Sequence, residues 1–342
     1  MALTMGDACG IGPEILAKLF RMPDSAGCVV LGDVAVMRRA AAQTGGLLAV
    51  AEVSRMADVS RAPPNCIPVW PVPGLPAGLM QAPQGAIDAR AGAAAAACIT
   101  HAVELALAGE VAGIVTAPIH KEALAAAGVP YPGHTEMLQA LCAPGGVPPA
   151  VRMMLANGEL RTVLVTIHMA LRDAIAAVTF DSVLQTIRIA HESAARWGQP
   201  APRIAVAGLN PHAGEGGLFG DEEILHIGPA IAAARAAGIN VRGPFAPDTV
   251  FMRARDAPGH SGEFDIVVAM THDHGLIPVK YLGVEHGVNV TLGLPLVRTS
   301  PDHGTAFDIA GTGRADPSSL LAALRMARRL CADAAHTPMS MP

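Results

Sequence analysis

The segment DIVVAMTHDH, residues 265–274, is a short apolar run that ends in histidines. The same pattern of an apolar run followed by histidine occurs twice more, in RTVLVTIH at residues 161–168 and in RIAVAGLNPH at residues 203–212. Each run is long enough for one strand. Its apolar residues follow one another with little alternation, which is typical of a strand buried on both faces of a parallel sheet. The three segments therefore predict neighbouring strands of an α/β fold.

Helical segments alternate with such strands along the chain, and this alternation favours a largely parallel sheet covered by helices on both faces. A proline or a capping residue marks the expected helix starts, which lie near Pro13, Ala86, Asp181, Asp221 and Pro317. Further buried strands are expected at residues 28–32, 113–116 and 288–292. The proline-rich segment 62–83 predicts an irregular excursion or a hairpin-bearing insert.

Composition excludes several classes of protein. The chain has 342 residues, of which 51% are hydrophobic, enough for one large or two ordinary domains. A net charge of -5 with only 15% charged residues provides no basic surface for nucleic acid or an anionic membrane. The six cysteines are widely spaced, so we expect free thiols in a reducing compartment. With no signal-type or membrane-spanning apolar segment, the sequence predicts a cytoplasmic protein.

The three strand-end histidines, His168, His212 and His272, are the main candidates for chemistry. Residues that follow parallel strands converge at one edge of a sheet, where ligands bind. Neutral imidazole is a common metal ligand, and three protein ligands leave positions open for a substrate oxygen. Any one of these histidines alone is more typical of a core or cap residue. Their joint occurrence predicts a divalent metal site.

Three glycine-rich or polar loops accompany these strands. Residues 208–223 allow close approach of the backbone to a ligand, but are also compatible with an Ω-type surface loop. Residues 298–311 carry an arginine, a histidine and two aspartates, and residues 5–14 indicate either an anion site or a tight strand-to-helix turn. No Gly-x-Gly-x-x-Gly follows a strand, so the motifs alone do not indicate a dinucleotide.

A set of longer motifs adds a resemblance to a known family. From the first residues to about Asp316, the chain resembles the 4-hydroxythreonine-4-phosphate dehydrogenases of vitamin B6 synthesis. The matching segments, in order, are MGDACGIGPEI, VTAPIHKEAL, GHTEM, IHMALRDA, GLNPHAGEGG, GPFAPDTVF, HDHGLIPVKYLG, GVNVTLGLP and RTSPDHGTAFDIAG.

The resemblance implies an architecture. It indicates a homodimer of two-domain α/β/α subunits, similar to isocitrate and isopropylmalate dehydrogenases, with an interdomain active site bordered by the second subunit. The first domain is expected to comprise residues 1–133 and 292–342. Residues 134–291 are then the second domain, which bears the metal and forms the dimer.

The resemblance also implies roles for individual residues. It places a divalent Zn, Mg, Mn or Co ion on His168, His212 and His272, the set that the strand ends had already selected. The substrate-binding positions are His134, Thr135, Lys280, Asn289 and Arg298. NAD or NADP is expected at His303, Gly304 and Thr305. For the proton transfer, Lys280, Asp248 and Asp273 remain alternatives.

The implied reaction is hydride transfer from a secondary alcohol to NAD, followed by loss of carbon dioxide from the resulting keto acid. Three substrates remain alternatives: 4-hydroxythreonine 4-phosphate, a 4-phosphorylated threonate or erythronate, and a terephthalate-type cis-dihydrodiol. From other classes, a lyase or acyltransferase without NAD, or a catalytically silent metabolite-binding protein, remains an alternative. Two departures from the family pattern are Ala8-Cys9 in place of Pro-Ala and His274 in place of Gln, and the second leaves the substrate open.

Overall fold

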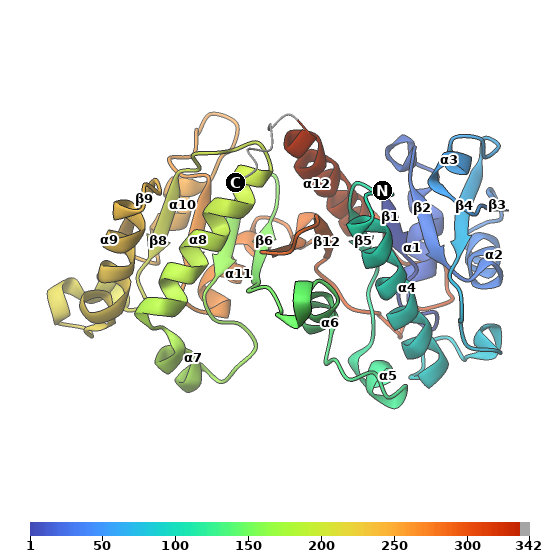
Figure 1. The fold of residues 1–342 in the computed structure, drawn as a ribbon, viewed down its shortest axis with the longest axis horizontal. Coiled ribbons are helices and arrows are strands. Elements are labelled where there is room, and N and C mark those ends of the chain that lie inside the picture. The colour runs from blue at the N-terminus through green and yellow to red at the C-terminus, as the bar shows by residue number, and fades with distance from the viewer. Residues whose placement is uncertain (336–342) are drawn as a thin grey trace. The chain divides into compact units, whose positions relative to one another are not determined.

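The chain forms two compact units, seen in the computed structural model, which describes residues 1–335 (Figure 1). Unit 1 comprises Met1–Pro149 and Leu294–Cys331, and unit 2 comprises Ala150–Gly293 with a short C-terminal piece that begins at Ala332. The boundary expected from the sequence had put residues 134–149 in the second domain. They belong to unit 1 because helix α6 (His134–Leu141) packs against α4 (Ala89–Leu107).

Unit 1 contains a parallel sheet with strand order β3-β4-β2-β1-β5-β12. Its strands are β1 (Ala2–Thr4), β2 (Val29–Gly32), β3 (Ala49–Glu52), β4 (Cys66–Pro71), β5 (Ile114–Thr116) and β12 (Arg298–Pro301). Besides α4 and α6, its helices are α1 (Gly12–Leu19), α2 (Val34–Gln43), α3 (Met56–Val59), α5 (Lys121–Ala126) and α12 (Ser318–Ala335). The central strands are fully buried, as the α/β fold class predicts.

Strand β4 corrects the expectation of an irregular proline-rich segment. It lies between β3 and β2 in the sheet, with Pro68 in register with Ala51. Ile67 and Val69 are completely buried on either side of Pro68. Burial of these two β-branched side chains outweighs the amide hydrogen that proline lacks, so tertiary packing overrides the local signal.

Unit 2 contains a mixed sheet with strand order β11-β6-β7-β10-β8-β9. Its strands are β6 (Arg152–Ala156), β7 (Arg161–Leu164), β8 (Ile204–Ala207), β9 (Val241–Phe245), β10 (Ile266–Ala269) and β11 (Val288–Leu292). Strand β6 is antiparallel to both of its neighbours, β11 and β7, whereas β7, β10, β8 and β9 are parallel. The sheet is therefore not parallel throughout.

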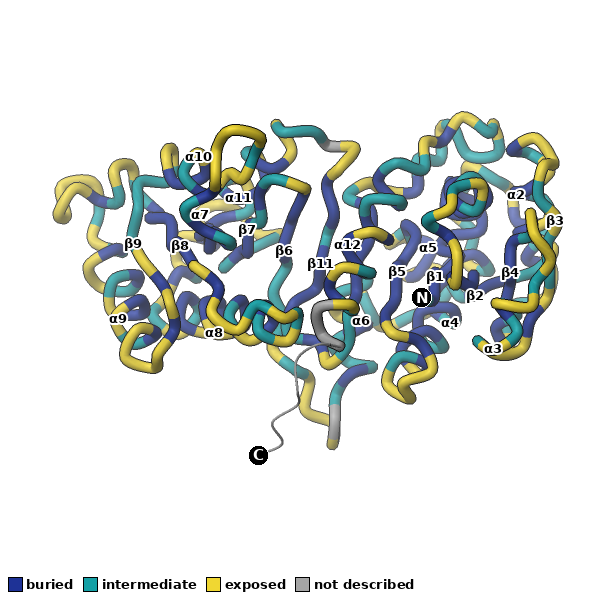
Figure 2. The backbone as a smooth tube through the Cα atoms, turned by 90° about the horizontal axis from the view of Figure 1, so that it is seen from above, coloured by how far each residue is buried: buried dark blue, intermediate teal, exposed yellow. Residues whose placement is uncertain are grey.

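Helices cover both faces of the second sheet. They are α7 (Leu171–Ala177), α8 (Phe180–Arg196), α9 (Gly228–Ala236), α10 (Val250–Ala254) and α11 (His272–Tyr281). Figure 2 shows α8 and α9 on one side of the buried strands and α10 and α11 on the other. Helix α8 begins with a reciprocal cap between Thr179 and Ser182, one residue before the expected start at Asp181.

Two further features concern membrane-spanning helices and the state of the cysteines. Within residues 1–335, none of the helices is both long and apolar enough to cross a bilayer. All six cysteines are free thiols, as their spacing predicted.

Candidate functional site

The three histidine-bearing segments leave neighbouring parallel strands at the same edge of the sheet in unit 2. Strand β10 lies between β7 and β8 and is parallel to both. Strand β7 ends at Leu164, β8 at Ala207 and β10 at Ala269. The carboxyl ends of the three strands therefore face one edge, as the sequence predicted.

His168 and His272 lie side by side at this edge. Their ring centroids are 5.5 Å apart, with an interplanar angle of 49°. The segments beyond the two strands remain bonded to each other, because Val165 donates its amide to Ala269 at 2.9 Å. Thr166 also bonds Met270 through its amide at 3.2 Å and its hydroxyl at 2.8 Å. These contacts bring the two imidazoles together.

Asp273 orients the ring of His272. The Oδ1 atom of Asp273 lies 2.8 Å from Nδ1 of His272. A carboxylate only accepts hydrogen bonds, so this contact favours a proton on Nδ1 and leaves the lone pair of Nε2 available. Such an imidazole is prepared to bind a metal ion through Nε2.

His212 occupies a different position from the other two histidines. It lies in the turn Pro211–Gly217, and two-thirds of its side chain is exposed. Within residues 1–335 of one chain, no group of three His, Cys, Asp or Glu side chains is arranged to bind a metal ion. The structure therefore brings together two of the three predicted ligands and leaves His212 outside the group.

In unit 1, the predicted anion-binding residue Arg298 acts electrostatically on His134, another predicted substrate-binding residue. Arg298 is buried, and its Nε and Nη2 atoms donate to Thr116 Oγ1 at 3.1 and 2.6 Å. Burial lowers the pKa of Arg298. Burial, and then the charge of Arg298, lowers the pKa of His134 well below its usual value. Thr135 follows on α6 and is half-buried.

The predicted cofactor loop rests on the first turn of α1. The amide of Ile11 donates to the carbonyl of Thr305 at 3.0 Å, while His303 and Gly304 are exposed. A Cβ atom on Gly10 would lie 2.9 Å from Cβ of Thr305, so glycine permits this approach. Residues 5–14 thus form a tight turn in which the amides of Asp7, Cys9 and Gly10 also donate to protein oxygen atoms.

Glu14 was not identified from the sequence, but it anchors this loop. Its buried carboxylate accepts hydrogen bonds from the amides of Gly313, at 2.8 Å, and Gly311. Lys18, one turn later on α1, donates to the carbonyls of Gly313 and Ala315. The only signal in the sequence was an acidic residue after a proline at the helix start. Acidic residues are common there in helices that hold no loop.

Three other predicted residues lie on other parts of unit 2. Lys280 is near the end of α11, eight residues after His272, which corresponds to about 12 Å along the helix axis. Asn289 is on β11, in register with Leu155 of β6. Asp248 is exposed in the turn before α10.

The departures from the family pattern have simple local settings. The Cys9 amide donates to Asp7 Oδ1 at 2.8 Å, closing the turn that Ala8 and Cys9 form. His274 is half-buried in the first turn of α11, and burial lowers its pKa. Its Nδ1 atom is buried and has no hydrogen-bond partner among the described residues.

Asp7 and His120 are further polar residues that sequence reasoning left without a role. Asp7 is completely buried, and burial raises its pKa to about 6, although the Cys9 amide and His120 act in the opposite direction. His120 stacks on Phe307 with ring centroids 4.7 Å apart. Both follow strands that pair in parallel, β1 and β5, so they lie at the carboxyl edge of the first sheet.

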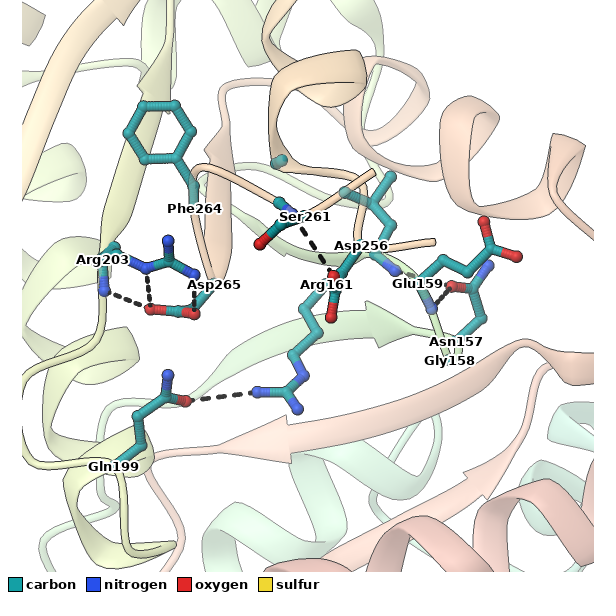
Figure 3. Close-up of a pocket in the computed structure, with 13 residues that line it drawn as sticks. Asn157, Gly158, Glu159, Arg161, Gln199, Arg203, Asp256, Ser261, Phe264 and Asp265 are labelled. Atoms are coloured by element: carbon teal, nitrogen blue, oxygen red, sulfur yellow. Dashed lines mark hydrogen bonds and ion pairs between the residues drawn. The ribbon is translucent and has the colours of Figure 1, made fainter. Parts of the chain in front are cut away.

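A cavity of about 160 Å³ lies in unit 2 near the amino ends of β7, β8 and β10, opposite the histidine edge (Figure 3). It contains none of the predicted site residues. Arg203 pairs with Asp265 at 2.8 Å, and Arg161 donates to Gln199 at 3.4 Å. Because its polar groups bond one another, we assign this cavity no part in the chemistry.

Comparisons with known proteins show that the chain is similar to dehydrogenases over almost its whole length. The 4-hydroxythreonine-4-phosphate dehydrogenase of Beijerinckia indica is 56% identical over 336 residues, which are 96% of this chain and 94% of that protein. The D-threonate 4-phosphate dehydrogenase of Pectobacterium atrosepticum is 44% identical over 96% of this chain and 98% of its own length. The crystal structure of the Klebsiella pneumoniae 4-hydroxythreonine-4-phosphate dehydrogenase matches with a TM-score of 0.86 and 43% identity, covering 97% of each chain.

The fold, the histidine edge and these relatives define the class of the protein, an α/β oxidoreductase of the dehydrogenase type. Residues 24–327 match the family described as pyridoxal phosphate biosynthetic protein PdxA. The chain belongs to this family. The resemblance and the isocitrate-dehydrogenase-like fold class expected from the sequence are thereby confirmed.

Proposed function

We propose that this protein catalyses the NAD-dependent oxidation of a secondary alcohol in a small phosphorylated hydroxy acid, with decarboxylation of the keto acid. The first substrate candidate is 4-hydroxythreonine 4-phosphate, which the relative at 56% identity is named for. The observation that carries the proposal is the pair of adjacent imidazoles, His168 and His272, at the carboxyl edge of the sheet in a chain of this family.

The donor set at this edge fits a divalent metal ion. Zinc binds imidazole nitrogen at about 2.0–2.1 Å, so two rings that share one ion have centroids roughly 5 Å apart. The observed 5.5 Å between His168 and His272 is close to that separation. Bound there, a Zn, Mg, Mn or Co ion would act as a Lewis acid that lowers the pKa of the substrate hydroxyl. Asp273 keeps His272 in the tautomer that such an ion needs.

A homodimer would complete this ligand set. We propose that His212 of the partner subunit joins His168 and His272, because His212 does not group with them within one chain and is largely exposed. Large apolar side chains are exposed on all three histidine-bearing segments, which indicates a surface that another subunit covers. They are Met169, Leu171, Leu218, Phe219, Ile277 and Tyr281.

Arg298 and His134 are proposed to bind an anionic group of the substrate, with Thr135, Lys280 and Asn289 as further substrate-binding residues. The guanidinium of Arg298 is buried, and a phosphate or carboxylate can bind such a group through short, charge-assisted hydrogen bonds. The Nε2 atom of His134 is buried and has no hydrogen-bond partner among residues 1–335, so it remains available to a ligand.

The remaining roles concern the cofactor and the proton. NAD or NADP is proposed to bind at His303, Gly304 and Thr305, on the loop that α1 supports. Asp273 bonds His272, which leaves Lys280 and Asp248 as the stronger candidates for moving the proton of the substrate hydroxyl. The free thiols favour a cytoplasmic, reducing setting.

The proposed function is tested by NADH formation from three substrates: 4-hydroxythreonine 4-phosphate, 4-phosphothreonate and a terephthalate cis-dihydrodiol. We expect the highest kcat/KM with the first, loss of activity after metal removal, and recovery on adding Zn²⁺ or Co²⁺. Full activity in metal-free protein would exclude the Lewis-acid role. Preference for 4-phosphothreonate would place this chain with its Pectobacterium relative. Binding of NAD without turnover of any substrate would indicate a silent binding protein, and absence of NAD binding would favour a lyase or acyltransferase.

A further inference from the structure

The turn that carries His212 has an unusual backbone. Six consecutive residues, 212–217, have positive φ angles, and three of them are not glycine: His212 at 53°, Ala213 at 52° and Glu215 at 43°. L-residues avoid this left-handed region because Cβ crowds the following carbonyl oxygen. A run of this kind persists only where surrounding contacts hold it in place.

Glu223 supplies those contacts. Its side chain is buried, 4% exposed, at the start of the π-helical turn Glu223–Ile227. Its Oε1 atom accepts the amides of Leu209 and Asn210 at 2.7 and 2.8 Å, and its Oε2 atom accepts Nδ2 of Asn210 at 2.9 Å. One carboxylate thus fixes the chain immediately before the left-handed turn.

Two glycines make room for this carboxylate on both sides of His212. A Cβ on Gly208 would lie 2.9 Å from Oε1 of Glu223 and 2.8 Å from Cα of Ala213. A Cβ on Gly214 would lie 2.8 Å from Oε2. The turn is therefore folded closely around the carboxylate, and His212 is carried on the segment that this packing fixes.

We propose that Glu223 is a positioning residue, which acts through the backbone of residues 208–214 to hold His212 where it binds the metal ion. This inference rests on the proposed metal site. The carboxylate is not itself a proposed metal ligand, because it bonds the amides of Leu209 and Asn210. Its contribution is to stabilise a strained turn that would otherwise sample many conformations and deliver the imidazole less often to the site.

The test compares Glu223→Ala and Glu223→Gln with a matched control, Glu222→Ala. Glu222 is the preceding acid, and its Oε2 accepts the Asn210 side chain at 2.6 Å. Within residues 1–335, its carboxylate bonds none of the backbone amides of residues 208–217. Glutamine keeps one carbonyl acceptor for the two backbone amides, so it partly replaces the carboxylate.

Two readouts are measured on the full-length assembled protein: the Kd of Co²⁺, from its visible absorption, and the hydrogen exchange of residues 208–217. We expect Glu223→Ala to raise the Kd by about 10- to 100-fold and to accelerate exchange of the Leu209 and Asn210 amides. Glu223→Gln should fall between Glu223→Ala and wild type. Glu222→Ala should stay within about threefold of wild type, and the NAD affinity of all variants should be unchanged.

Wild-type Co²⁺ affinity in Glu223→Ala or, if that variant does not fold, in Glu223→Gln would overturn the inference, as would an equal loss in the Glu222→Ala control. Unchanged exchange of residues 208–217 would also overturn it. A separate comparison tests the proposed metal site itself. If that site is wrong, the wild-type protein will bind Co²⁺ no more tightly than the His168→Ala variant does.

Discussion

The Oδ1 atom of Asp273 lies 2.8 Å from Nδ1 of its neighbour His272, whose ring is tilted by 49° to that of His168, with the ring centroids 5.5 Å apart. Because this contact selects the tautomer of His272, we predict that Asp273→Asn weakens divalent metal binding by about 10- to 100-fold. Metal affinity can be measured by competition with a chelator. Asp256→Asn, an exposed carboxylate near the opposite edge of the sheet, is the control and should leave the affinity unchanged. Equal affinities in both variants would contradict this role for Asp273.

The bond between Glu14 and the loop at residues 303–313 leads to a second prediction. Glutamine at position 14 has only one acceptor oxygen, so one of the two glycine amides loses its partner, at a cost of about 1–3 kcal/mol. We expect Glu14→Gln to raise the Kd of NAD by roughly tenfold and leave metal affinity unchanged. Calorimetry measures both. Glu122→Gln, an exposed acid in the first turn of α5, should behave as wild type.

Asp7 predicts a pH-dependent change in stability. Burial raises its pKa to about 6 from 3.8, so the folded state holds this proton more tightly than the unfolded state. The stabilising contribution is fully present below pH 3.8 and is lost as the pH rises through 6. Asp7→Asn removes this dependence. The unfolding free energy of the variant, relative to wild type, should therefore rise by about 2–3 kcal/mol between pH 4 and pH 8. Urea unfolding at several pH values provides the measurement, and a constant difference would refute the prediction.

The close packing of α4 against α5 depends on Gly92. A Cβ atom there would lie 2.0 Å from the carbonyl oxygen of Ala123, a backbone atom that cannot move aside by a rotamer change. We predict that Gly92→Ala lowers the free energy of unfolding by about 3 kcal/mol, despite the better helix propensity of alanine. Gly158→Ala is the matched control, since its added Cβ meets no atom within 4 Å, and it should change stability by at most about 0.5 kcal/mol. Similar denaturation midpoints for the two variants would show that the helices can separate without cost.

Local sequence predicted the strands on which the site is built, because continuous apolar runs that end in polar residues have few alternative structures. Strands β7, β8 and β10 were expected within a few residues of their observed bounds, and β11 was expected at Val288–Leu292, where it is found. Strand β4 was missed because its prolines resemble a loop until the burial of Ile67 and Val69 is known. Strand β6 was not predicted either, and its antiparallel direction depends on the partner strands that only the fold provides.

Some residues of the candidate site were indicated by the sequence, and others were found only in the structure. The sequence indicated His168, His212 and His272 as strand-end residues, and the family resemblance indicated the type of reaction. Neither indicated that Glu14 and Glu223, two ordinary-looking acids near helix starts, each hold a glycine-rich loop through backbone amides. A carboxylate that bonds distant amides leaves no pattern in local sequence, because its partners are set by how the chain folds back.

By itself, then, the sequence determined the α/β class, the three histidine-bearing strand ends and membership of a dehydrogenase family, since these depend on local apolar patterns and long motifs. Only the tertiary structure decided that His168 and His272 are adjacent while His212 lies outside their group in one chain. The physical reason is that strand order and loop conformation are set by long-range hydrogen bonds and burial, which local residue patterns do not encode.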